Sequence, residues 1–65
     1  MEVKVNKKII TIPEGYKVID LLDHLNYGRN VSVFIDKTQL LMSEYESTQI
    51  KENNNIRIIR PLGGG

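Results

Sequence analysis

The absence of cysteine constrains this chain most, because 65 residues leave few other ways to strengthen a small fold. No disulfide can crosslink the chain, and a single histidine without any thiol argues against a structural zinc site. A domain of about 60 residues buries only about 60% of the surface that its unfolded chain exposes. We therefore expect one domain that rests on a single apolar core, for which a hydrophobic content of 40% is sufficient.

The same counts exclude several classes of protein. With no cysteine nucleophile, no histidine pair and little room for a walled pocket, we expect neither an autonomous enzyme nor a metal site. A net charge of +1 argues against a nucleic-acid partner. No run approaches the roughly 18 apolar residues of a membrane helix, and the alternating start of the chain is unlike a signal peptide. A cytoplasmic carrier, adaptor or binding module without a membrane partner is the expectation.

Hydrophobic periodicity predicts a β-hairpin at the start of the chain. Val3 and Val5 alternate with charged residues, which is typical of a half-buried strand. The β-branched run 9–12 predicts a second strand that Pro13 ends. The polar break at 6–8 between them predicts the hairpin turn, although the favoured Asn-Gly pair is missing.

One amphipathic helix is predicted over residues 17–26. Its apolar stripe follows the i, i+3, i+4, i+7 spacing through Val18, Leu21, Leu22 and Leu25. The start lacks a Ser, Thr, Asp or Asn cap, and the aspartates of the helix are assigned to a solvated face. Asn26-Tyr27-Gly28 is expected to end the helix, with Gly28 free to take the left-handed conformation.

The second half of the chain predicts three further strands. These are a strand over 31–35, a short one at 40–41 after a turn at 36–37, and a last strand over 56–60 that Pro61 stops. The order predicts an α+β fold, a mixed four- to five-stranded sheet with one main helix packed on one face. The expected core comprises Val3, Val5, Ile10, Ile12, Val18, Leu21, Leu22, Leu25, Val31, Val33, Ile35, Leu40, Leu41, Ile50, Ile56 and Ile58.

Three glycines end the chain, and they predict a flexible tail over 61–65 that follows a domain over 1–60. A frayed terminus or a leftover linker is the alternative explanation of these glycines. A tail without Cβ atoms can thread a channel that admits only backbone. Its terminal carboxylate, with a pKa of about 3.5, is ionised at neutral pH and can attack the α-phosphate of ATP. A partner enzyme would then perform the chemistry on this chain.

With these features the whole chain resembles the ThiS-type ubiquitin-like sulfur carriers of thiamin biosynthesis, which have a β-grasp fold. The matching segments are Val3-Lys4-Val5-Asn6, Pro13-Glu14-Gly15, Val18-Ile19-Asp20-Leu21-Leu22, Val31-Ser32-Val33-Phe34-Ile35-Asp36 and Ile56-Arg57-Ile58-Ile59-Arg60-Pro61-Leu62-Gly63-Gly64-Gly65. Three turns depart from the family pattern, which has Asn-Gly, Asn-Gly and Gly-Asp where this chain has Asn6-Lys7, Asp36-Lys37 and Asn54-Asn55. These departures concern turn types and leave the tail unaffected.

The resemblance implies a carrier that is acted on by enzymes and binds no cofactor itself. A ThiF-like adenylating enzyme uses Mg-ATP to adenylate the terminal glycine, a cysteine desulfurase or another donor supplies sulfur, and thiazole synthase receives it from a thiocarboxylate. Gly65 would carry the modification, while Leu62, Gly63 and Gly64 would thread the channel of the enzyme. The third glycine is extra, so either Gly65 is the acceptor or it is first removed; we take Gly65.

Four residues near the end of the sheet are candidates for partner docking. If Val33 and Ile58 face the helix, then Phe34 and Ile59 face away from it as an apolar patch. Arg57 and Arg60 lie on the strand that leads to the tail and are candidates to pair with acidic groups of a partner. Scattered exposed apolar residues and solvated arginines are the ordinary alternative.

Three other functions compete with a thiamin-pathway carrier. The chain can instead be a sulfur carrier for another pathway, such as a molybdopterin-like or amino-acid biosynthetic one. It can be a non-catalytic β-grasp binding module of the TGS type, which would leave the terminal glycines unexplained. It can also be a modifier that is conjugated to lysines through the same adenylation.

Overall fold

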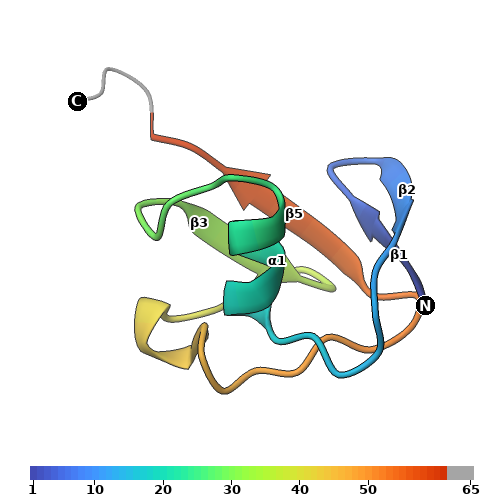
Figure 1. Cartoon of the computed structure of the whole chain (residues 1–65). Helices are drawn as coiled ribbons and strands as arrows, with labels where there is room; N and C mark the ends of the chain where they lie inside the picture. Colours follow the sequence, from blue (N-terminus) through green and yellow to red (C-terminus); the bar gives the residue numbers. More distant parts are fainter. Residues whose placement is uncertain (62–65) are drawn as a thin grey trace.

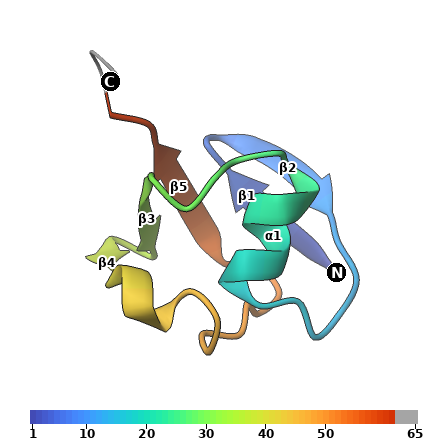
Figure 2. The same cartoon turned by 60° about the vertical axis from the view of Figure 1, so that its left-hand side comes forward.

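The structure is a computed structural model that describes residues 1–61 (Figure 1). One mixed sheet contains five strands in the order β2-β1-β5-β3-β4, and α1 packs on one of its faces (Figure 2). This arrangement confirms the predicted α+β fold. The elements in chain order are β1 (Glu2–Val5), β2 (Lys8–Thr11), α1 (Val18–His24), β3 (Ser32–Ile35), β4 (Thr38–Gln39), the 3₁₀ helix η1 (Met42–Glu44) and β5 (Asn55–Ile59).

β5 is the central strand, although it comes last in the chain. It runs parallel to β1, with Val5 opposite Ile56, and antiparallel to β3, with Val33 opposite Ile58. β2 extends the sheet beyond β1 as the predicted hairpin, and β4 extends it beyond β3. Both sheet edges are therefore short hairpin strands, and the strand that leads to the C-terminus is held from both sides.

The predicted strand at 40–41 is wrong by two residues, and Leu41 does not belong to the core. The two-residue turn at Asp36–Lys37 returns the chain at once, so β4 pairs with β3 already at Thr38. Leu41 is instead the residue immediately before η1, its N-cap, and is 68% exposed. The geometry of the turn therefore determines where β4 begins, whereas the apolar pair Leu40-Leu41 does not.

The buried core consists of eleven predicted residues and one that was missed. Tyr45 is only 2% exposed, and its hydroxyl donates a hydrogen bond to the Val31 carbonyl at 2.8 Å. This bond satisfies the phenol inside the core, which a buried tyrosine requires. The buried residues are Val3, Val5, Ile12, Val18, Leu21, Leu22, Val31, Val33, Tyr45, Ile50, Ile56 and Ile58.

Both ends of α1 are capped, although the sequence has no standard N-cap residue and the left-handed residue at the other end is not the expected Gly28. The Lys17 N–H donates to the Asp20 carboxylate at 2.8 Å, so an aspartate assigned to the solvated face closes the first turn. At the other end Asn26 has a φ of 62° and takes the left-handed place expected of Gly28. The Tyr27 N–H then donates to the Leu22 carbonyl at 2.8 Å, as in a Schellman motif.

The two hairpin turns share one backbone geometry. Asn6 and Lys7 have φ of 49° and 71°, and Asp36 and Lys37 have φ of 48° and 74°. Two successive positive φ angles define the type I′ turn, whose twist matches that of paired strands. A lysine in the second position is strained, because its Cβ approaches the backbone where glycine has no such atom.

We predict that Lys7→Gly and Lys37→Gly each raise the free energy of unfolding by about 0.5–1 kcal/mol. The strain relieved is about 1–2 kcal/mol, and the greater freedom of glycine in the unfolded chain offsets part of it. Urea unfolding measures the change. Lys7→Ala is the matched control, because it removes the amine but keeps the Cβ and should give no gain. Stabilisation by the alanine variant as well would mean that charge, and not backbone strain, matters at this turn.

Candidate partner interface and the C-terminal exit

The face of the sheet opposite α1 carries three of the four predicted docking residues. We call this the open face and define it by Lys4, Ile9, Phe34, Arg57 and Ile59. Phe34 and Arg57 lie opposite one another on β3 and β5, while the intervening Ile56 and Ile58 are buried. Ile59 is 40% exposed and Ile9, on β2, is 66% exposed. On the strand that leads to the terminus, Arg57 thus has Phe34 opposite it and Ile59 two residues further along on the same face.

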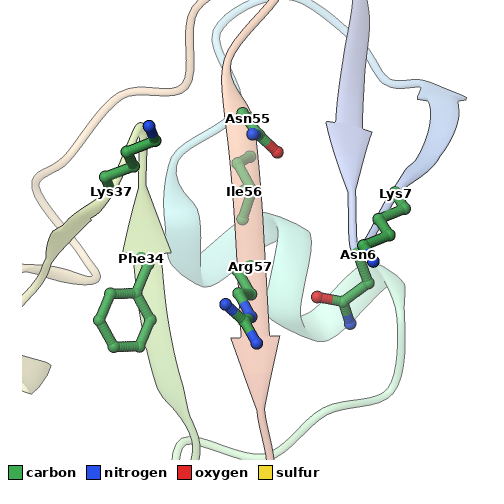
Figure 3. Close-up of a pocket in the computed structure, with 7 residues that line it drawn as sticks. All are labelled: Asn6, Lys7, Phe34, Lys37, Asn55, Ile56 and Arg57. Carbon is green, nitrogen blue, oxygen red and sulfur yellow. The ribbon is translucent and has the colours of Figure 1, made fainter.

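A shallow depression on the open face runs along β5 (Figure 3). The phenyl ring of Phe34 lies on one side, with the guanidinium of Arg57 beside it and the amide of Asn6 beyond. Lys7 and Lys37, the strained lysines of the two turns, contribute to the lining from opposite sides of β5. No carboxylate lines the depression in the part of the chain that the structure describes. Its chemistry therefore suits a partner that offers an apolar contact with acidic groups around it.

The side chain of Asn6 completes the backbone pairing of β5. Where β1 turns away, the Asn6 carboxamide accepts a hydrogen bond from the Ile58 N–H at 2.9 Å and donates one to the Ile58 carbonyl at 3.2 Å. These are the two bonds that a continuing parallel strand would make, because a carboxamide offers the same donor and acceptor as a peptide group. Asn6 therefore holds β5 two residues before Arg60.

Asp36 does the same at the opposite end of β5. Its backbone N–H donates to the Asn55 carbonyl at 2.9 Å, and its carboxylate accepts from the Asn55 N–H at 2.9 Å. The other carboxylate oxygen accepts from the Asn54 side-chain amide at 2.9 Å. The first residue of each type I′ turn thus holds one end of the central strand. The sequence predicted neither role, because Asn6 and Asp36 are far from β5 in the chain. Only the folded sheet brings these two turn residues next to the ends of β5.

Arg60 lies apart from the other predicted docking residues. Its guanidinium carbon is 4.7 Å from the centroid of the Tyr27 ring, in the segment that follows α1. Leu62, Gly63, Gly64 and Gly65 lie outside the described residues. Across residues 1–61, acidic and histidine side chains nowhere gather into a group that could hold a metal ion. The described region also has no helix long and apolar enough to cross a membrane.

We predict that Asn6→Gly lowers the free energy of unfolding by about 1–2 kcal/mol. Glycine keeps the positive φ, but the Ile58 N–H and carbonyl lose both partners, and each such bond contributes about 0.5–1.5 kcal/mol. Denaturant unfolding measures the loss, and hydrogen exchange should accelerate more at the Ile58 amide than at the other amides of β5. The matched control is Lys7→Gly in the same turn, which should stabilise. An Ile58 amide that exchanges as in the parent would refute the clamp.

Comparison with known proteins gives one consistent result. The model of the ThiS family matches residues 1–65. A crystal structure of the thiamine biosynthesis protein ThiS from Geobacter metallireducens superposes with a TM-score of 0.86 at 26% identity, covering 100% of both chains. A solution structure of a thiamine biosynthesis protein from the same organism gives a TM-score of 0.83 at 26% identity over 100% of this chain and 88% of that one. No curated protein matches the chain.

Proposed function

The chain belongs to the ThiS family, and from this premise we propose that it is a sulfur carrier protein. In this role the chain presents the C-terminal carboxylate of Gly65 to an adenylating enzyme. After sulfur transfer, the terminus is a thiocarboxylate that delivers the sulfur to another enzyme. The observation that carries the proposal is the family match over the whole chain, including the Gly-Gly-Gly end that comes three residues after the central strand in the sequence. Formation of the thiazole ring in thiamin biosynthesis is the favoured destination of the sulfur.

The proposed chemistry takes place in three steps on the terminal carbonyl. A carboxylate oxygen attacks the α-phosphate of Mg-ATP, and pyrophosphate leaves. A persulfide from a cysteine desulfurase or a similar donor then attacks the acyl carbon, and AMP leaves. A second thiol finally reduces the acyl disulfide, which releases the thiocarboxylate and leaves a disulfide behind. Each step uses groups of the partner enzymes, so the carrier supplies only its terminus and a surface for docking.

Intact mass spectrometry tests the carrier role directly. The protein is incubated with a ThiF-like adenylating enzyme, Mg-ATP and a sulfur donor, and we expect the mass difference of sulfur replacing oxygen. A variant that lacks Gly64 and Gly65 is the matched control and should remain unchanged. A full-length chain of unchanged mass would favour a TGS-like binding module. Attachment of the chain to lysines of other proteins would favour a modifier. Modification that persists without the two glycines would refute the role of the terminus.

We predict that the open face docks the adenylating enzyme, so that Phe34→Ala and Ile59→Ala each raise the KM for the carrier. Loss of a central apolar contact costs about 1 kcal/mol or more, which corresponds to at least about a fivefold change. Each variant should stay within about 1 kcal/mol of the parent in stability, because neither side chain belongs to the buried core.

Pyrophosphate exchange at varied carrier concentration measures this effect, with urea unfolding alongside. Leu41→Ala is the matched control, because Leu41 is also an exposed apolar residue but precedes η1 as its N-cap and lies outside the open face. An equal effect of the Leu41 variant, or a collapse of stability in the other two, would contradict docking through the open face.

A further inference from the structure

Arg60 lies on the α1 side of the sheet, although its neighbour Ile59 belongs to the open face. Side chains alternate along β5, with Ile58 buried toward α1 and Ile59 exposed, so the next side chain returns to the α1 side. There the Arg60 guanidinium carbon lies 4.7 Å from the centroid of the Tyr27 ring. This distance is within the roughly 6 Å range in which a cation is attracted to the face of an aromatic ring.

Tyr27 provides a fixed platform for this contact. Its backbone N–H donates to the Leu22 carbonyl at 2.8 Å, and the left-handed Asn26 before it closes the C-terminal motif of α1. The Tyr27 side chain is half-buried and packs against the core. The ring is therefore tied to the helix and the core, whereas Arg60 belongs to the segment that leaves the sheet.

The backbone of this segment is restricted as well. Pro61 fixes its own φ near −65°, and it confines the preceding Arg60 to extended conformations. A side chain anchored at Arg60 therefore limits the directions that the following residues can take. In the described region, the one ion pair joins Arg29 and Glu46, so the aromatic ring is the contact that anchors this guanidinium.

We propose that the stack of Arg60 on Tyr27 sets the direction in which the chain leaves the sheet at Pro61, which makes both residues positioning residues for adenylation. This inference rests on the proposed function. A segment that is aligned before docking loses less conformational freedom when it enters the enzyme, so the stack should favour association. It makes no contact with the reacting atoms, so the rate of the bound complex should not depend on it.

A double-mutant cycle separates positioning from direct contact between Arg60 and the enzyme. Tyr27→Leu removes the ring but keeps an apolar side chain, Arg60→Ala removes the cation, and Tyr27→Phe is the control that keeps the ring. In pyrophosphate exchange with a ThiF-like enzyme, each of the first two should raise the KM for the carrier about two- to fivefold, with kcat unchanged. The double variant should be no worse than the more affected single variant, and Tyr27→Phe should match the parent.

Two results would overturn the inference while leaving the proposed function intact. The effects of Tyr27→Leu and Arg60→Ala would multiply in the double variant if Arg60 contacted the enzyme independently of the ring. In the free protein, the δ-methylene protons of Arg60 should show an upfield ring-current shift in NMR spectra that Tyr27→Phe keeps and Tyr27→Leu abolishes. Absence of that shift in the parent would refute the stack itself. Failure of the parent to support any exchange would instead refute the proposed function, and the positioning role with it.

Discussion

The pairing of β5 along its full length is the interaction on which the rest of the structure depends. This last strand joins the N-terminal hairpin to the β3–β4 hairpin, and it buries Ile56 and Ile58 beneath α1. Its two ends are completed by side chains, with the Asn6 carboxamide on Ile58 and the Asp36 carboxylate on Asn55. Each of these side chains belongs to the first residue of a type I′ turn. Asn6 and Asp36 therefore both close a hairpin and hold one end of the central strand.

This arrangement connects the fold to the proposed chemistry. Because β5 leads without a break into Arg60 and Pro61, every contact that holds the strand also fixes the point from which the C-terminal segment starts. One face of the sheet is used for the core, and the other carries the half-buried Phe34 together with the exposed Arg57 and Ile59. The proposed carrier needs a stable origin for its terminus and a surface that an enzyme can recognise, and in this proposal a single small sheet supplies both.

Much of this fold could be predicted from local pattern, because period-two and helical spacing are local properties. The alternation around Val33 and Ile58 correctly assigned Phe34 and Ile59 to the face away from the helix. Tyr45 was missed because it is the single buried residue in a polar segment, and only tertiary packing brings its hydroxyl to Val31.

One local prediction failed, and contacts over long sequence separations could not be predicted at all. At the end of α1 the left-handed residue is Asn26 and not Gly28, because asparagine also tolerates this conformation. No local pattern indicates that Asn6 pairs with Ile58 or that Arg60 meets Tyr27, because the fold alone brings these segments together. The predicted roles of Leu62 to Gly65 lie outside the described residues and remain predictions.

The central claim is that the reactive group of this protein is its own terminal carboxylate, displayed by an otherwise unreactive domain. The most direct test compares the free acid with a semisynthetic chain whose Gly65 ends in a carboxamide, in pyrophosphate exchange catalysed by a ThiF-like enzyme. The account predicts that only the free acid supports exchange, and that the carboxamide form, with its docking face intact, inhibits the reaction competitively. Exchange supported by the carboxamide form would contradict the account, because it would place the adenylated group elsewhere in the chain.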